Sequence, residues 1–176
     1  NMFDCIVSLI TPPLKGAVAL IRISGDKSLE IINNIFSREV SKSHYVYYGF
    51  IVDKSNNETI DEVMVSYFKA PKSFTGEDVV EISCHGGLIV TDKVLKAVYD
   101  AGAIPAEAGE FTKRAFLNGK MDLTSAESVM NIISAQGEQA EKIALGVLEG
   151  RLFKEIKKIN DKLVYDMALL SAWVDY

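Results

Sequence analysis

The sequence is poor in the residues that build metal centres and disulfide frameworks. It contains two cysteines, Cys5 and Cys84, and two histidines, His44 and His85, and their spacing matches no zinc-binding pattern. Two cysteines so far apart in sequence are too few for a disulfide framework and fit a reducing, cytoplasmic environment. We therefore expect free thiols and no metal site.

Excess positive charge and long apolar runs are also missing. Nineteen Lys and Arg residues stand against 24 Asp and Glu, for a formal net charge of −5, which excludes a broad basic surface that would bind nucleic acid unaided. No apolar run approaches the ~20 residues of a membrane span, and no leader-peptide pattern is evident. We expect a cytoplasmic protein without membrane contact. Without a G-x-x-x-x-G-K-[ST] phosphate loop, the chain is not expected to hydrolyse GTP.

What the sequence does contain is typical of a folded globular domain, with 48% hydrophobic and 24% charged residues. Alternating or β-branched segments predict strands at residues 5–10, 17–23, 44–52, 60–68, 78–85 and around Ile104. Helical spacing predicts a helix over 25–36, with Asp26 as its N-cap, and another over 88–99 with Leu88, Val94, Leu95 and Val98 facing inward. Segments 44–52 and 60–68 are expected to pair antiparallel, and the mixture indicates an α+β fold.

Three charged residues, Arg22, Glu81 and Lys120, occupy different settings in the predicted elements. Arg22 shares a strand face with apolar side chains, and is either a structural ion-pair partner or an anchor for an anionic ligand. Glu81 lies on one face of the strand 78–85 together with His85. Lys120 occupies a glycine-bearing turn, where a lysine is ordinarily just solvated.

The segment that ends in Cys84, His85, Gly86 and Gly87 is open to several interpretations. Adjacent strand residues point to opposite faces, so a Cys84–His85 nucleophile pair is not expected to share a proton. The two glycines mark a turn into a helix, or a place where backbone approaches a ligand closely.

The last third of the sequence is helical throughout. We expect a short helix over 110–118, a second one opened by a Thr124–Glu127 capping box and ending near Ala135, and a long amphipathic helix from Glu138 onward. The apolar seam of the long helix comprises Leu145, Leu148, Leu152, Ile156, Ile159, Leu163, Met167, Leu170 and Val174. A seam of this length must be buried, so we expect a truncated chain whose helical partner or second subunit is missing.

Six short motifs occur in register along the chain. They are TPP at 11–13, LIRISG at 20–25, FTGED at 74–78, HGG at 85–87, GEFTKRAFLN at 109–118 and KMDL at 120–123. Each is weak alone, but in this order and spacing the chain resembles the N-terminal part of the tRNA-modification GTPases of the MnmE family, also called TrmE.

The resemblance implies a tetrahydrofolate-binding α/β domain similar to aminomethyltransferases, over residues 2–119, followed by the first part of an all-α domain over 120–176. The family's folate-binding arginine, glutamate and lysine fall on Arg22, Glu81 and Lys120. The implied ligand is 5-formyltetrahydrofolate or 5,10-methylenetetrahydrofolate. GTP, magnesium and potassium would belong only to a GTPase domain outside this chain.

The resemblance also implies partners. The N-terminal domain is expected to form a homodimer, to work with the flavin- and NADH-dependent protein MnmG, and to meet tRNA in the full complex, where the wobble uridine is modified with a one-carbon unit from the folate. This chain alone is not expected to be catalytic.

Two rival interpretations remain open. In the first, the chain is purely a dimerisation scaffold, and Arg22, Glu81 and Lys120 form ion pairs. In the second, it is an independent hydrolase or transferase that uses His85 or Cys84, and its turnover would be lost on His85→Ala substitution.

Overall fold

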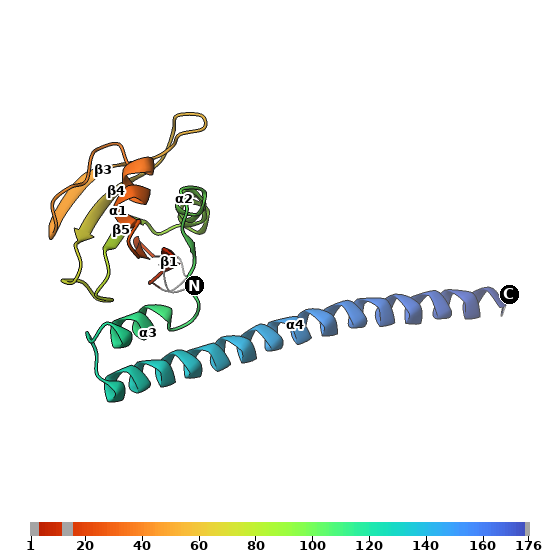
Figure 1. Ribbon diagram of the computed structural model, residues 1–176. Helices are drawn as coiled ribbons and strands as arrows, with labels where there is room; N and C mark the ends of the chain where they lie inside the picture. Colours follow the sequence, from red (N-terminus) through yellow and green to blue (C-terminus); the bar gives the residue numbers. More distant parts are fainter. Residues whose placement is uncertain (1–3, 12–15, 175–176) are drawn as a thin grey trace. The chain divides into compact units, whose positions relative to one another are not determined.

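The computed structural model describes residues 4–11 and 16–174, so Pro12 and Pro13 lie outside the described residues. The described strands form one mixed sheet in the order β3-β4-β5-β2-β1-β6 (Figure 1). Their bounds are β1 (Ile6–Leu9), β2 (Val18–Ser24), β3 (Tyr45–Asp53), β4 (Glu58–Phe68), β5 (Val79–His85) and β6 (Ile104–Pro105). β1 and β6 pair parallel and all other neighbours pair antiparallel. The predicted strands and the predicted antiparallel pair are confirmed, and the fold is α+β.

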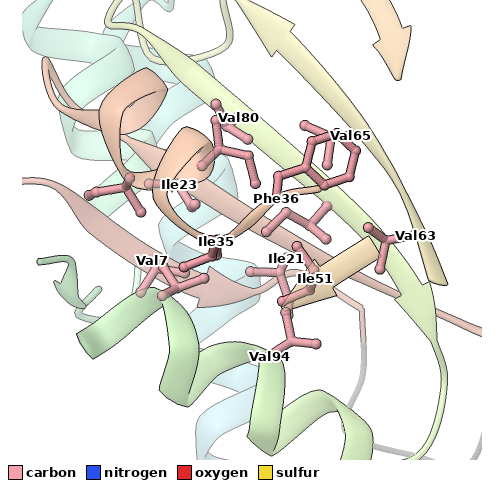
Figure 2. Packing of buried hydrophobic residues seen from close by; sticks show 14 of the residues in the cluster. Val7, Ile21, Ile23, Ile35, Phe36, Ile51, Val63, Val65, Val80 and Val94 are labelled. Atoms are coloured by element: carbon pink, nitrogen blue, oxygen red, sulfur yellow. The ribbon is translucent and has the colours of Figure 1, made fainter. Parts of the chain in front are cut away.

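Two helices pack on one face of this sheet. They are α1 (Ser28–Ile35) and α2 (Leu88–Asp100). Alternate strand residues point toward them, and the resulting core joins sheet residues such as Ile21, Ile51 and Val80 to Ile35 and Val94 (Figure 2). Because Ile21 and its neighbours of the same parity fill this core, Arg22 lies on the opposite face.

Two local expectations for these helices are wrong. Lys27, not Asp26, holds the N-cap position of α1, and it makes no side-chain capping bond. The buried Ser28 instead ties the helix start to the sheet, because its hydroxyl donates to the carbonyls of Gly25 and Asp78 at 2.8 and 3.1 Å. In α2, Leu88 is 56% exposed, and the inward face begins one turn later.

The C-terminal part of the described chain contains α3 (Glu110–Leu117) and α4 (Leu123–Val174). The break expected near Ala135 is absent from the described residues, so two expected helices are one. The chain divides into two compact units, Asn1–Met130 and Asn131–Tyr176, and the boundary expected at 119/120 from the resemblance stays a prediction. Among the described helices, none is long and apolar enough to cross a membrane.

The seam of α4 is described only in part. Leu145, Ile156, Ile159 and Leu163 are each more than half exposed. The other predicted seam side chains, Leu148, Leu152, Met167, Leu170 and Val174, lie outside the described ones. The expected partner for the seam therefore stays a prediction.

The cap of α4 also differs from the expected capping box. Thr124 lies inside the helix, and the backbone N–H of Ser125 donates to Oδ1 of Asp122 at 2.7 Å. The backbone N–H and hydroxyl of Ser125 lower the pKa of the Asp122 carboxyl. Helix starts favour such a residue because its oxygen satisfies a backbone donor that has no partner within the helix.

We therefore predict that Asp122→Ala lowers the midpoint of thermal unfolding, whereas Thr124→Ala changes it less. A carboxyl whose pKa is lowered in the folded state stabilises it above the pKa of the unfolded state, and this contribution is lost as the pH falls through the lowered value. The difference between the two variants should accordingly be present at pH 7 and shrink in strong acid, as followed by circular dichroism. A larger effect of Thr124→Ala than of Asp122→Ala would contradict this prediction and favour Thr124 as the N-cap of the helix.

Candidate functional site

The centre of the candidate site is a pair of opposite charges on the sheet face away from α1 and α2. Arg22 on β2 lies directly opposite Glu81 on β5 in the antiparallel register. The Nε and Nη2 atoms of Arg22 donate to Oε1 of Glu81 at 3.3 and 3.2 Å. The two side chains are 16% and 22% exposed, so the pair is mostly shielded from solvent. Two of the three predicted site residues are thus in direct contact.

Two aromatic rings flank the guanidinium of Arg22. Its Cζ atom lies 4.6 Å from the ring centroid of Phe74 and 5.5 Å from that of Phe111. At these distances the rings attract the cation through their π-electrons. Neither ring was predicted as a site residue, although both belong to motifs that carry the family resemblance.

A buried arginine fixes the two segments that supply these rings. Nη1 of Arg114 donates to both carboxylate oxygens of Glu77, at 3.1 and 3.2 Å, and Nη2 donates to Glu110 at 3.1 Å. Arg114 is 3% exposed, and its Nε is buried without a hydrogen-bond partner among the described residues. Glu77 also accepts a hydrogen bond from Ser24 at the end of β2. Sequence reasoning missed this network, which joins α3, the loop 74–78 and β2.

Lys120, the third predicted residue, is placed beside the same loop. Its backbone N–H donates to the carbonyl of Ala115 at 2.8 Å, and the preceding turn is anchored because Asn118 donates to the carbonyl of Thr75 at 2.8 Å. Gly76 has φ +80, and a Cβ there would lie 3.1 Å from Cγ of Lys120. The structure thus packs the stem of Lys120 on the loop that carries Phe74, without joining it directly to Arg22 or Glu81.

Lys120 is an exposed residue, and no ion pair joins its ammonium to any described residue. Oε2 of Glu81 likewise receives no hydrogen bond from the described residues. The site therefore offers one cation and one carboxylate oxygen to a ligand, beside an arginine that contacts two aromatic rings. Such a set can bind a flat heterocycle that presents N–H donors and anionic or carbonyl oxygens.

The two cysteines lie in the hydrophobic core and not on this face. Cys84 is 3% exposed on the core side of β5. Burial, with a smaller contribution from the charge of Asp61, raises the pKa of its thiol to about 11. Burial likewise raises the pKa of Cys5. At neutral pH both remain thiols, which are poor nucleophiles.

The neighbouring glycines serve different purposes. A Cβ on Gly86 would lie 2.0 Å from the carbonyl oxygen of Gly16, so the close approach at Gly86 is to the chain's own backbone. A Cβ on Gly87 would meet nothing within 4 Å. The expected close approach of a ligand can therefore apply only to Gly87.

Two cavities lie elsewhere on the domain. One, of about 610 Å³, is formed by the end of α1, the β3–β4 hairpin and α2, on the opposite side of the sheet from Arg22. The other, of about 430 Å³, lies beside His85. Neither is lined by Arg22, Glu81 or Lys120.

Comparison with known families identifies the larger part of the chain. A family model described as "GTP-binding protein TrmE N-terminus" matches residues 5–120. This range contains all the residues of the candidate site.

Curated relatives extend the match over nearly the whole chain. The chain is 46% identical over 177 aligned residues to a protein of Lacticaseibacillus paracasei, 45% identical over 177 to one of Latilactobacillus sakei, and 44% identical over 179 to one of Enterococcus faecalis, each named "tRNA modification GTPase MnmE". Each alignment covers 99% of this chain and 38% of the relative. The chain thus spans well under half the length of the relatives it matches.

Proposed function

Since the chain belongs to the MnmE (TrmE) family of tRNA-modification GTPases, we propose that it is the folate-binding, homodimerising module of such a protein. The observation that carries the proposal is the Arg22–Glu81 pair, whose guanidinium also contacts the rings of Phe74 and Phe111, near the loop that supports Lys120. The proposed fold relationship is with the tetrahydrofolate-binding domains of aminomethyltransferases.

The residues fit a reduced folate chemically. The 2-amino group and ring N–H of a pterin are adjacent donors, and a carboxylate such as Glu81 can accept both. Glu81 has a free oxygen for the first donor, and its second oxygen becomes available if Arg22 turns toward the carbonyl oxygen of the pterin. Phe74 or Phe111 can then stack on the ring.

Lys120 supplies what the other two residues lack. Its unpaired ammonium, on a stem supported by Gly76, can meet a carbonyl or carboxylate oxygen of the ligand. The proposed ligands are 5-formyltetrahydrofolate and 5,10-methylenetetrahydrofolate, which differ in the state of the one-carbon unit.

The remaining functions concern the whole protein. We propose that it acts as a homodimer in the cytoplasm, with the flavin- and NADH-dependent protein MnmG and tRNA as partners, to modify the wobble uridine. GTP, magnesium and potassium are assigned to a domain beyond the matched part. For this chain alone we propose binding and not catalysis.

A structural scaffold is the second candidate, and one observation favours it. Arg22 and Glu81 do form an ion pair, as that interpretation requires. That interpretation also requires Lys120 to be paired, but its ammonium has no ion-pair partner in the described part of the chain. The Arg22–Glu81 pair alone does not separate the two candidates, so ligand binding must.

Titration of 5-formyltetrahydrofolate into variants tests the proposal. We expect Glu81→Gln to weaken binding about tenfold or more, because hydrogen bonds to a charged group contribute about 1.5–3 kcal/mol. Lys120→Ala should weaken it by a smaller factor, since its ammonium is exposed.

Two matched controls accompany these variants. Glu30→Gln removes an exposed carboxylate on α1, and Lys113→Ala removes an exposed lysine on α3. Both should bind like the parent chain. If folded Glu81→Gln protein binds as tightly as its Glu30→Gln control, Glu81 does not recognise the folate and the scaffold is the better interpretation.

A further inference from the structure

A second polar pair lies on the same sheet face, at the far end of β5. His85 Nδ1 lies 2.8 Å from Oδ1 of Asp61, and the backbone N–H of His85 donates to Oδ2 of Asp61 at 2.8 Å. The described pairing of β4 with β5 ends at Met64 and Ser83. The backbone N–H of His85, the last residue of β5, therefore donates to the Asp61 carboxylate and not to a backbone carbonyl of β4. The side chain of Asp61 is 10% exposed, whereas that of His85 is 67% exposed.

This arrangement fixes which ring nitrogen of His85 is free. An ionised carboxylate only accepts hydrogen bonds, so Nδ1 carries the proton that is donated to Asp61. In the neutral imidazole, Nε2 is then an acceptor with no partner among the described residues. Asp61 thus orients the ring and presents an acceptor to solvent.

His85, which carries this acceptor nitrogen, lines a cavity with several apolar side chains. The cavity of about 430 Å³ is lined by Val18, Tyr48, Met64, Ser83 and His85, among others, and by Glu62, whose carboxylate accepts a hydrogen bond from the Tyr48 hydroxyl. Val18, Tyr48 and Met64 are each more than half exposed. A flat apolar ring that carries an N–H donor would cover these side chains and donate to Nε2.

The pairing of β2 with β5 shows how far this cavity lies from the Arg22–Glu81 pair. Glu81, Ser83 and His85 alternate along one face of β5, and His85 pairs with Val18 while Glu81 pairs with Arg22. Four residues of strand separate the two positions by about 13 Å. That span is comparable with the distance from the pterin edge of a folate to its p-aminobenzoyl ring, and the ring is linked through N–H groups.

We propose that the cavity beside His85 is the subsite for the p-aminobenzoyl part of the folate, and that Nε2 of His85 accepts a hydrogen bond from one of its N–H groups. The identity of the ligand rests on the proposed function, whereas the oriented acceptor and the apolar walls do not. Asp61 is a positioning residue that keeps Nε2 free.

A truncated ligand separates this subsite from the pterin site. 5-Formyltetrahydrofolate contains the p-aminobenzoyl group, whereas 6-methyltetrahydropterin lacks it. We expect His85→Ala to weaken binding of the full folate about five- to tenfold, the range for loss of a neutral hydrogen bond, and to leave the truncated pterin unaffected. Glu81→Gln should weaken both ligands.

The other histidine supplies the control. His44→Ala removes the imidazole of an exposed residue just before β3 and should change neither affinity. In addition, ¹⁵N chemical shifts should show His85 protonated at Nδ1 in the parent chain and lose that preference in Asp61→Ala, which removes the oxygen that accepts from Nδ1.

Each outcome decides something different. If Glu81→Gln weakens both ligands while His85→Ala weakens neither, or weakens both equally, the subsite is wrong and the pterin site stands. If neither ligand binds the folded parent chain, the subsite falls together with the proposed function.

Discussion

Replacing Arg114 with alanine is expected to lower the free energy of unfolding by about 3–5 kcal/mol, because breaking a buried ion pair leaves an uncompensated charge. Arg114 is 3% exposed and binds Glu77 and Glu110 at once. Without it, two carboxylates that are mostly shielded, with side chains 17% and 20% exposed, would face each other unneutralised. Equilibrium denaturation followed by circular dichroism measures the loss.

Two comparison variants make this prediction specific to burial. Lys96→Ala breaks the Lys96–Asp100 pair, whose side chains are 77% and 67% exposed, and should change stability by less than about 1 kcal/mol. The triple variant Arg114→Met, Glu77→Gln, Glu110→Gln removes all three charges and should recover much of the loss, since the penalty comes from unpaired buried charge. A loss in Arg114→Ala no larger than that in Lys96→Ala would show that the network does not hold α3 to the loop 74–78.

Gly86→Ala is expected to destabilise the domain by about 3 kcal/mol, at the upper end of the usual cost of overpacking. A Cβ there would lie 2.0 Å from the carbonyl oxygen of Gly16 and 2.6 Å from its carbonyl carbon. Both atoms are backbone, so relief requires the segment before β2 to move away from the end of β5. Thermal and denaturant unfolding both measure this change.

Gly87→Ala is the matched control for this variant. A Cβ at Gly87 meets nothing within 4 Å, and its φ of −125° is ordinary for any residue. We expect a change within about 0.5 kcal/mol. Equal effects of the two substitutions would mean that the glycine pair serves the turn into α2 rather than the backbone contact with Gly16.

Much of the sheet was predictable because its signal is local. Alternation along residues 17–23 and 78–85 placed Arg22 and Glu81 each on a definite face, and the structure confirms both strands. Their direct pairing was not predictable in the same way. It depends on β5 lying next to β2, although 54 or more residues separate them in sequence, and no local pattern encodes that neighbourhood.

The network around Arg114 shows what local reasoning misses. An arginine in a short amphipathic helix is ordinarily expected at the surface. It is buried here because Glu77 reaches it from a loop 37 positions earlier in the sequence. Phe74 and Phe111 were missed for the same reason, since their common partner Arg22 is distant in sequence from both.

Helix starts were also only partly predictable. Thr124 and Glu127 satisfy the capping-box pattern, but Asp122 lies two residues earlier and offers a better acceptor to Ser125. Both candidates fit the sequence rule, and only the chain path out of the preceding turn decides between them. Lys120 was identified through the family resemblance and not through its own pattern, which is that of a solvated surface lysine.

Binding of a reduced folate is the central property proposed for this chain. Isothermal titration of 5-formyltetrahydrofolate, with light scattering on the same sample, tests this directly. We predict a saturable isotherm with about one folate per subunit of a dimer. A folded dimer that gives no binding isotherm would contradict the folate site and leave the chain as a dimerisation scaffold.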